Sequence, residues 1–362
     1  MDDFDRDVHC LGGLPFDAVT LTQAADIIRD AAIQKQPCFV STPNLNFTML
    51  AQRDAAFRKS VLCSNLVIAD GMPLVWAAKM LGMPIVERVA GSDVFEALRD
   101  LVSTNAPIKV YFFGGPEGVA EQAARRLNAQ HGGLYCVGFA SPGFVPVEAM
   151  STPERIAAIN ASGADFLVVS LGAKKGQEWI MRNRGQLRVP IISHLGAVLN
   201  FEAQTVRRAP VWMQHAGMEW LWRIGQEPAL WRRYAKDGWA FSKWWSGCIL
   251  PYMLWLRRHR PCQGAIKGQI LVQKQDAGCR LVVTGGICNP VMPEIRMALR
   301  ESLACRGDVT LDMAQAIYLS SGFLGLLLLL EDKLSEQGRQ LHMTGAKGDL
   351  TKLLRWSGVL SA

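Results

Sequence analysis

The chain has 362 residues, of which 49% are hydrophobic and 20% are charged, and its formal net charge is +7. A composition this apolar excludes a largely disordered chain, and the length predicts two or three domains. The modest basic excess suits an acidic partner, such as a nucleotide, an anionic lipid or a nucleic acid, and selects none of the three.

Short apolar runs alternate with amphipathic stretches over the first 210 residues. This alternation predicts an α/β fold with a Rossmann-like, mostly parallel sheet. The expected strands cover residues 11–16, 38–40, 66–69, 108–113, 134–139, 166–171 and 191–194. The expected helices cover residues 21–34, 47–60, 73–81, 92–102, 118–130 and 156–161. We expect Ser92 and Asp93 to cap the fourth helix, because their side-chain oxygens accept hydrogen bonds from free helix amides.

Polar residues follow two of the expected strands at the points where those strands end. Thr42 and Asn44 come after the second strand, and Asp70 comes after the third. Because open α/β sheets bind ligands at the carboxyl ends of their strands, we expect a binding site there. Gly114 and Gly115 lie between a later strand and its helix, where they either favour phosphate binding or form a tight connection.

The composition changes at about residue 210, and residues 211–262, which we call the appendage, are rich in tryptophan, lysine and arginine. Residues 223–260 hold eight basic residues against two acids, and residues 244–256 form an apolar run of 13. That run is too short to span a bilayer, but tryptophan flanked by arginine suits the headgroup layer of a membrane. The alternative is that these tryptophans pack on the rest of the chain or on a partner subunit.

A smaller α/β unit follows an expected linker at residues 261–264. We therefore expect a core domain at residues 1–210, the helical appendage at 211–262 and a C-terminal domain at 263–362. The C-terminal domain is expected to have strands at 266–273, 280–284, 308–313 and 340–343, and helices at 290–305, 320–333 and 348–357. Charged residues directly follow the leucine run at 326–330, which predicts a buried helix instead of a membrane segment.

The cysteine pattern and the hydropathy bear on the cellular compartment. Nine cysteines are scattered without a CxxC pair or a metal-type Cys/His spacing, which predicts reduced, buried thiols in the cytosol. The acidic N-terminus lacks the apolar segment of a secretory signal. No apolar run reaches the ~18 residues of a membrane span, so we expect none.

Several motifs, taken together and in order, resemble those of the WecG/TagA/CpsF glycosyltransferases. They lie at residues 42–44, 69–72, 87–93, 113–115, 171–178, 207–212, 217–221, 226–228 and 231–234. The resemblance implies an inverting transferase that moves a sugar, of N-acetylmannosamine or glucose type, from a UDP-sugar to a polyprenyl-pyrophosphate-linked acceptor. It further implies no cofactor, no essential metal, a role in cell-surface polysaccharide synthesis and a peripheral place on the inner face of the cell membrane.

Inverting sugar transfer needs a base that takes the proton of the acceptor hydroxyl, and a carboxylate can do this. The resemblance assigns this role to Asp70, for which the alternative is a helix cap. The residues expected to contact donor or acceptor are Thr42, Asn44, Gly71, Arg88, Ser92, Asp93, Gly114, Gly115, Gln177 and Glu178. The chain departs from the family at residues 172–178, where the usual proline is absent and one glycine is inserted.

The leaving UDP develops negative charge, which metal ions, arginines or helix amides stabilise. The sequence has no Asp-x-Asp metal motif of the usual kind, so arginines and amides are expected to serve. The arginines expected at the pyrophosphate are Arg207, Arg208, Arg223, Arg232 and Arg233. The resemblance implies that the appendage closes over the site and supplies them, while the alternative for each is a solvated surface charge. His194 ends a strand near the site, and we assign it no catalytic role.

The C-terminal domain resembles a STAS domain at residues 309–313, 319–325 and 338–342. In signalling members a serine at the start of a helix is phosphorylated. Ser320 holds that position as the candidate phosphoacceptor, although Leu319 replaces the usual aspartate before it. The alternative is a docking module without a switch. Beyond the two substrates, the partners expected are a membrane surface, a STAS-binding protein and a second copy of the chain.

The competing function is a non-catalytic, membrane-associated scaffold that acts through the STAS domain. The presence of Thr42, Asp70 and Gln177 favours an enzyme. Nucleic-acid binding is disfavoured, because the aromatic residues of the appendage cluster in one apolar run and do not interleave with basic residues.

Overall fold

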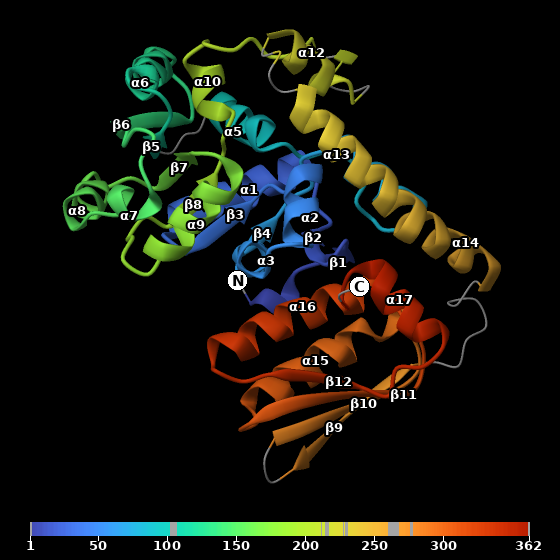
Figure 1. The fold of residues 1–362 in the computed structure, drawn as a ribbon. Helices are drawn as coiled ribbons and strands as arrows, with labels where there is room; N and C mark the ends of the chain where they lie inside the picture. The colour runs from blue at the N-terminus through green and yellow to red at the C-terminus, as the bar shows by residue number, and fades with distance from the viewer. Residues whose placement is uncertain are drawn as a thin grey trace.

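The computed structural model describes residues 2–101, 107–210, 212–213, 217–226, 228, 231–259, 268–275 and 278–360, without the side chains of Arg233 and Pro290. Figure 1 shows the core domain around a large sheet, the long helix of the appendage along one side, and the C-terminal domain with its own smaller sheet. The linker expected at residues 261–264 lies outside the described residues.

The core domain is built on a six-stranded parallel sheet with the strand order β4-β3-β8-β7-β5-β6. The strands are β3 (Cys38–Ser41), β4 (Leu66–Val67), β5 (Ile108–Gly114), β6 (Leu134–Ala140), β7 (Phe166–Ser170) and β8 (Ile191–His194). The chain passes from β3 to one edge, then to β5 and β6 at the other edge, and β7 and β8 fill the space between. The expected α/β, Rossmann-like architecture is confirmed, and its winding reverses beside β3 and β8, where such sheets bind ligands.

Helices cover both faces of this sheet, because successive side chains of a strand point to opposite faces. Val168 of β7 belongs to a buried cluster with α1, α5, α6 and α10, whereas Val169 belongs to a cluster with α7, α8 and α9. The bounds of these helices are α1 (Leu21–Gln34), α5 (Gly91–Asp100), α6 (Val119–Ala129), α7 (Val147–Met150), α8 (Pro153–Ala161), α9 (Ala173–Asn183) and α10 (Val198–Glu202). Neither α7 nor α9 is among the helices expected from the sequence.

The first expected strand, at residues 11–16, is instead an antiparallel hairpin of β1 (Val8–Leu11) and β2 (Leu14–Asp17). Gly12 and Gly13 form its turn with φ angles of +60° and +79°, a region that favours glycine. The hairpin forms a sheet of its own and lies against the C-terminal domain. The prediction is wrong because buried residues on both sides of a short turn read as one apolar run.

The expected helix at residues 47–60 is two helices, α2 (Leu45–Ala51) and α3 (Ala55–Leu62). Asp54 separates them, because its side chain accepts a hydrogen bond from the Phe57 amide and starts the second helix. The next helix, α4 (Met72–Met80), has proline in its first turn, as expected.

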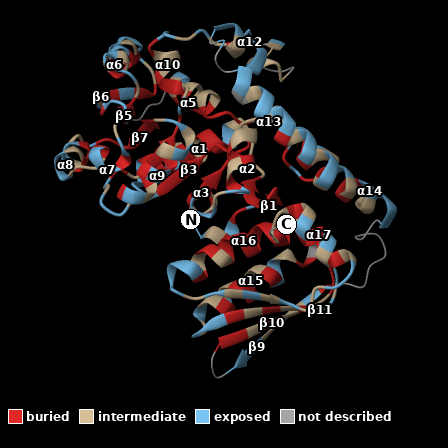
Figure 2. Cartoon of the chain, in the orientation of Figure 1, coloured by how far each residue is buried: buried red, intermediate tan, exposed pale blue. Residues whose placement is uncertain are grey.

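The appendage contains α12 (Glu219–Gln226) and a long helix formed by α13 (Trp231–Trp244), η3 (Trp245–Ile249) and α14 (Leu250–His259). The segment η3 is a π-helical turn just before Pro251, which lacks an amide hydrogen and does not fit a regular α-helical turn. Trp244 and Tyr252 are buried, as the packing alternative predicts. Trp231 and Trp239, however, are 55% and 66% exposed, and Figure 2 shows most of α13 as exposed.

The C-terminal domain has a four-stranded sheet in the order β12-β11-β10-β9, in which only the β9–β10 pair is antiparallel. Its strands are β9 (Gln269–Gln275), β10 (Gly278–Ile287), β11 (Asp308–Leu319) and β12 (Leu341–Thr344), and its α-helices are α15 (Met292–Ala304), α16 (Ser321–Glu336) and α17 (Asp349–Ser357). Short 3-10 helices are η1 (Asp3–Asp5) in the core domain and η4 (Asn289–Val291) here. The leucine run at residues 326–330 is fully inside buried α16, which confirms a core helix.

The cysteines and the apolar helices bear on two expectations from the composition. Of the eight cysteines in the described ranges, seven are free thiols, but Cys288 is disulfide-bonded, so the expectation of reduced thiols is wrong at that residue. Among the described residues, no helix has both the length and the hydropathy needed to cross a membrane.

Candidate active site

A cavity of about 640 Å³, which we call the main cavity, opens at the carboxyl edge of the large sheet beside β3 and β8. Two parts of the chain line it. Its core wall includes Thr42, Asn44, Asn46, Asp70, Gly71, Met72, Arg88, Gly91, Ser92, Gly172, Ala173, His194 and Phe201. Its appendage wall consists of Gly217, Glu219, Trp220, Arg223, Tyr234, Asp237, Gly238 and Phe241.

Asp70 lies between β4 and α4 in the core wall. Its amide donates a hydrogen bond to the Pro43 carbonyl at 2.9 Å, which holds the backbone at the sheet edge. Gly71, and not Asp70, is the N-cap residue of α4, and no side chain caps that helix. The helix-cap alternative is therefore wrong, and the Asp70 carboxylate is available to the cavity.

Burial in the cavity wall raises the pKa of the Asp70 carboxyl to about 6. Nearby Arg88 and Arg223 oppose this rise, Glu219 adds to it, and the Gly91 amide donates a hydrogen bond to the carboxylate. A carboxylate with this pKa is ionised at pH 7 yet binds a proton more readily than an ordinary aspartate. It thus suits the task of a general base near neutral pH.

Arg88 joins the two walls of the main cavity. Its Nη1 atom lies 2.9 Å from Glu219 Oε2 of the appendage, and its Nη2 atom lies 2.9 Å from Asp93 Oδ2 of α5. Arg208 also contacts Asp93, so this carboxylate holds two arginines. The expectation that Ser92 and Asp93 cap α5 is wrong, because Ala90 is the N-cap and no side chain caps the helix.

Three helices of the core domain begin at the main cavity. Gly71, Gly91 and Gly172 lie at the first residues of α4, α5 and α9, and all three line the cavity. Gly91 allows a close approach, because a Cβ atom there would lie 2.4 Å from Leu195 Cδ2. Free amides at helix starts favour an anion, so this edge is suited to a phosphate group.

The appendage wall is fastened to the core wall by specific contacts. Asn46 Nδ2 donates to Asp237 Oδ1 of α13 at 3.1 Å. The Arg223 guanidinium of α12 lies 5.7 Å from the centre of the Phe201 ring. The appendage thus closes one side of the main cavity and brings a cation toward Asp70.

The structure places some of the expected contact residues in the main cavity and others outside its lining. Thr42, Asn44, Gly71, Arg88 and Ser92 line it. Asp93 does not line it, and its carboxylate pairs with Arg88 and Arg208.

Gln177 and Glu178 of α9 are not brought into the lining of the main cavity. Gln177 is 1% exposed, and its Nε2 donates to Ser41 Oγ at 3.0 Å, which ties α9 to β3. Glu178 is exposed. The two residues are adjacent in the sequence. The sequence alone does not show that α9 buries Gln177 behind the cavity and turns Glu178 toward solvent.

Gly114 and Gly115 also lie outside the lining of the main cavity. A Cβ atom on Gly114 would lie 2.3 Å from the Ser170 carbonyl oxygen, and one on Gly115 would lie 2.4 Å from Leu199 Cδ2. Both have positive φ. These glycines therefore serve the tight-connection alternative, in which Gly114 passes close to the backbone of Ser170 and Gly115 close to the Leu199 side chain.

The five expected arginines separate into different environments. Arg223 lines the main cavity, whereas Arg207 and Arg208 line an adjoining cavity of about 420 Å³ that shares Ser92 and Phe201 with it. Arg232 is exposed and lies over the Trp231 ring, and the Arg233 side chain lies outside the described part of the chain.

His194 lines the main cavity, although sequence reasoning assigned it no role. Its Nε2 donates to the Leu171 carbonyl at 2.6 Å, and burial lowers the pKa of the ring, so it is neutral at pH 7. Gly176, the inserted glycine, packs on the ring, where a Cβ atom would lie 2.1 Å from His194 Cδ2. Tyr234 and Asp237 were also missed, because helical spacing alone does not show what a helix faces.

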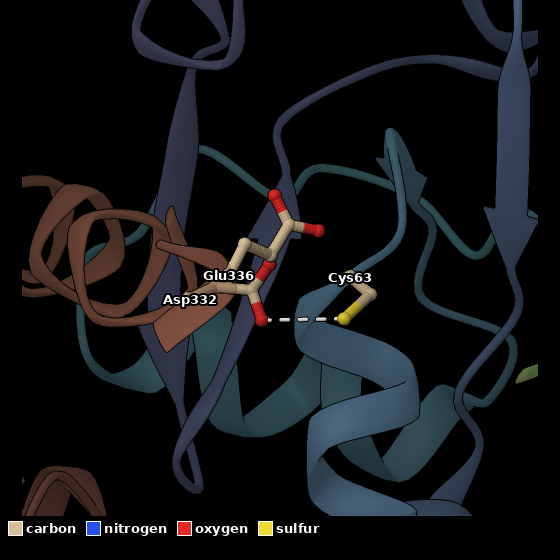
Figure 3. A group of neighbouring side chains, drawn as sticks. All are labelled: Cys63, Asp332 and Glu336. Atoms are coloured by element: carbon tan, nitrogen blue, oxygen red, sulfur yellow. Dashed lines mark hydrogen bonds between the residues drawn. The ribbon is translucent and has the colours of Figure 1, made fainter. Parts of the chain in front are cut away.

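One group of side chains in the described residues is spaced closely enough for a metal ion: Cys63, Asp332 and Glu336 (Figure 3). It lies outside the main cavity, between α3 and α16. Lys59 Nζ is 2.6 Å from Asp332 Oδ1, and burial raises the pKa of the Cys63 thiol to about 12. A protonated thiol beside an already paired carboxylate is a poor metal site, and the two carboxylates pair instead with Lys59 and Arg184 of the core domain.

Ser320, the candidate phosphoacceptor, is 6% exposed and caps α16 by accepting a hydrogen bond from the Phe323 amide. The next residue, Ser321, has its Oγ atom 3.0 Å from His9 Nδ1 of the hairpin. The hydroxyl of Ser320 is thus engaged within the fold, at the contact between two domains.

Comparison with known proteins adds two family matches and several relatives. A model described as the Glycosyl transferase WecG/TagA/CpsF family matches residues 8–247, and one described as Mlab, STAS domain matches residues 270–360. A protein of Bacillus spizizenii is 26% identical over 55% of this chain and 76% of its own length. Proteins of Bacillus subtilis and Staphylococcus aureus are each 24% identical, over 61% and 62% of this chain and 84% and 85% of their own lengths. All three carry the name N-acetylglucosaminyldiphosphoundecaprenol N-acetyl-beta-D-mannosaminyltransferase.

Proposed function

We propose that this chain, which belongs to the WecG/TagA/CpsF family of glycosyl transferases, moves a sugar from a UDP-sugar to a sugar carried on a polyprenyl diphosphate, with inversion. The names of the relatives support a donor of N-acetylmannosamine type, with glucose type as the second choice. The product would serve in cell-surface polysaccharide synthesis. The observation that carries the proposal is Asp70, a carboxylate of pKa about 6 in a cavity with anion-binding groups.

In this proposal Asp70 takes the proton of the acceptor hydroxyl as its oxygen attacks the anomeric carbon. A bond forms between that oxygen and the carbon, while the bond from the carbon to the diphosphate oxygen breaks. UDP leaves with the electron pair. Attack on the face opposite to the leaving group inverts the anomeric carbon, and a single base is sufficient for this displacement.

The negative charge on the leaving diphosphate is assigned to Arg223 and to the amides at the starts of α4, α5 and α9. Arg223 comes from the appendage and lines the cavity that holds Asp70. Arg207 and Arg208 in the adjoining cavity are assigned to the diphosphate of the acceptor. No metal and no cofactor enters this scheme, so excess EDTA is expected to leave the transfer rate unchanged.

The exposed face of the long helix is assigned to the membrane surface. Trp231, Trp239 and Leu254 are exposed along it, and Lys236, Lys243, Arg257 and Arg258 supply cations beside them. Aromatic rings with neighbouring cations bind the headgroup layer, where a polyprenyl diphosphate is anchored. The protein would then act peripherally on the inner face of the cell membrane.

The test incubates the purified protein with a panel of UDP-sugars and polyprenyl-diphosphate sugars and measures UDP release and the lipid product. Transfer with one pair, and its loss in Asp70→Asn, supports the proposal. Failure of every pair would overturn it in favour of the scaffold. In a second arm, Trp239→Ser should weaken binding to anionic vesicles, while Phe144→Ser, which alters a 91% exposed aromatic outside the appendage, should not.

A further inference from the structure

The helix of the C-terminal domain that carries Ser320 faces the core domain. Strand β1 lies against α16, and a Cβ atom on Gly325 would lie 2.8 Å from the Val8 carbonyl oxygen. One buried apolar cluster includes side chains of the hairpin, the appendage and this domain, among them Leu11, Trp244 and Leu327. The C-terminal domain is therefore a packed part of the molecule and does not hang on a free tether.

Ion pairs surround this contact and join the same two domains. The pairs are Arg58–Glu331 at 3.3 Å, Lys59–Asp332 at 2.6 Å, Arg184–Glu336 at 3.2 Å, Lys333–Asp3 at 2.9 Å and Arg300–Asp2 at 2.6 Å. Ser320 is 6% exposed at the start of α16, so a kinase would reach its hydroxyl only if the packing around it opened. The face on which a partner or a phosphate would act is thus occupied by the core domain of the same chain.

A second surface of the C-terminal domain holds the far end of the long helix. The Trp255 ring of α14 stacks at 6.0 Å on Tyr318 of β11, and its Nε1 donates to Asp349 Oδ2 of α17 at 3.1 Å. Tyr252 stacks on Trp356 at 6.1 Å. Two aromatic contacts and one hydrogen bond to a carboxylate fix α14 on this domain.

The near end of the same helix lines the main cavity. Tyr234, Asp237 and Phe241 of α13 belong to the appendage wall, and Asp237 accepts from Asn46 of the core wall. From Phe241 to Trp255 the chain is continuously helical, a span of roughly 20 Å at 1.5 Å per residue. The span includes the π-helical turn η3 but is helical without a break, so we expect a displacement of α14 to shift α13.

We propose that the STAS domain is a brace for the active site: it holds α14 so that α13 closes the main cavity, and Trp255 is its principal positioning residue. This inference rests on the proposed function for its kinetic consequence, but the geometric consequence is independent of it. No described residue of the STAS domain lines the main cavity, so its effect on the cavity is indirect, and Trp255 tests the route through the long helix.

The experiment uses the full chain with Trp255→Ala and, in case that variant fails to fold, Trp356→Ala. The matched control is Ile295→Val, which removes a buried methyl group from α15, a helix of the STAS domain that makes none of the aromatic contacts holding α14. Hydrogen exchange is measured in α13 and α2, with β10 and β11 as an internal reference for the STAS domain itself. The KM for the UDP-sugar and kcat are measured in parallel.

We expect Trp255→Ala to increase exchange in α13 and α2 and to raise the donor KM about tenfold, with a smaller change in kcat. The control should leave both unchanged. Unaltered protection of α13 in both Trp variants, or an equal effect of Ile295→Val, would overturn the brace. If the wild type turns over no substrate pair but the exchange result holds, the brace stands and the proposed reaction fails.

Discussion

The two walls of the main cavity are built differently. The core wall stands on the carboxyl edge of a buried parallel sheet, where Asp70, Thr42 and His194 are positioned by backbone and by close-packed glycines. The appendage wall stands on helices with exposed outer faces, fastened by a few contacts such as Asn46–Asp237 and Arg88–Glu219. From this difference we infer that the core wall holds the reacting groups. The appendage wall would then close the cavity and supply positive charge.

The largest expected effect is on the core wall, in Asp70→Asn. Removing the base should lower kcat by about 10²- to 10⁴-fold, the range typical of general-base catalysis. Far-ultraviolet circular dichroism should confirm an unchanged fold. Residual transfer near the wild-type rate would contradict the assignment of the base.

The same variant should alter stability in a pH-dependent way. The folded state raises the pKa of Asp70 to about 6 from 3.8, so it binds more protons than the unfolded chain between these pH values. Ionised Asp70 therefore destabilises the fold above pH 6, and Asp70→Asn should gain up to about 3 kcal/mol there. Below pH 3.8 both states are protonated and the gain should vanish in denaturant titrations.

On the appendage wall, Arg223→Ala should raise the donor KM about 10- to 150-fold, because a charge-assisted hydrogen bond contributes about 1.5–3 kcal/mol. The matched control is Arg232→Ala, an exposed arginine of the same appendage that does not line the cavity. Steady-state kinetics at saturating acceptor measures both. An equal effect of the two substitutions would mean that the net charge of the appendage, and not the site, determines binding.

Two glycine substitutions test whether the core wall is packed more tightly than the appendage wall. Gly176→Ala places a methyl group against the buried His194 ring and should cost about 1–3 kcal/mol of unfolding free energy. Gly225→Ala in α12 meets nothing within 4 Å and should stabilise that helix by up to about 1 kcal/mol. Thermal unfolding of both variants measures the two changes in unfolding free energy. Equal changes would contradict the conclusion that the two walls are packed differently.

The smallest expected effect is a shift in pH dependence from Arg88→Gln. Arg88 lowers the pKa of Asp70, so its removal should move the acidic limb of kcat/KM upward by about one pH unit. The base acts when deprotonated, and the variant should therefore lose more activity at pH 6 than at pH 8. A profile parallel to that of the wild type would show that Arg88 acts only in binding.

The sequence predicts the core wall better than the appendage wall, for a physical reason. Asp70 and Thr42 follow apolar strands, and strand ends meet at one edge of a parallel sheet, so their proximity follows from local pattern. The direction that a helix faces depends on tertiary packing, so the roles of Tyr234, Asp237 and Gln177 could not be predicted from it.

The fold shows the same division. The alternating strands and helices of the large sheet are predictable, because strands buried on both faces read as short apolar runs between amphipathic helices. The β1–β2 hairpin and the burial of Ser320 are not, because both depend on contact between segments some 300 residues apart. The inserted Gly176 is visible in the sequence, but the His194 ring that requires it is visible only in the structure.

The most direct test of the account is one kinetic experiment in which Asp70→Asn and Arg223→Ala are measured side by side with the wild type. It uses a UDP-N-acetylmannosamine donor and a polyprenyl-diphosphate N-acetylglucosamine acceptor. We predict that Asp70→Asn loses kcat, while Arg223→Ala raises the donor KM and retains most of kcat. Sugar transfer that survives in Asp70→Asn, together with a loss of kcat in Arg223→Ala, would contradict the division of labour between the two walls.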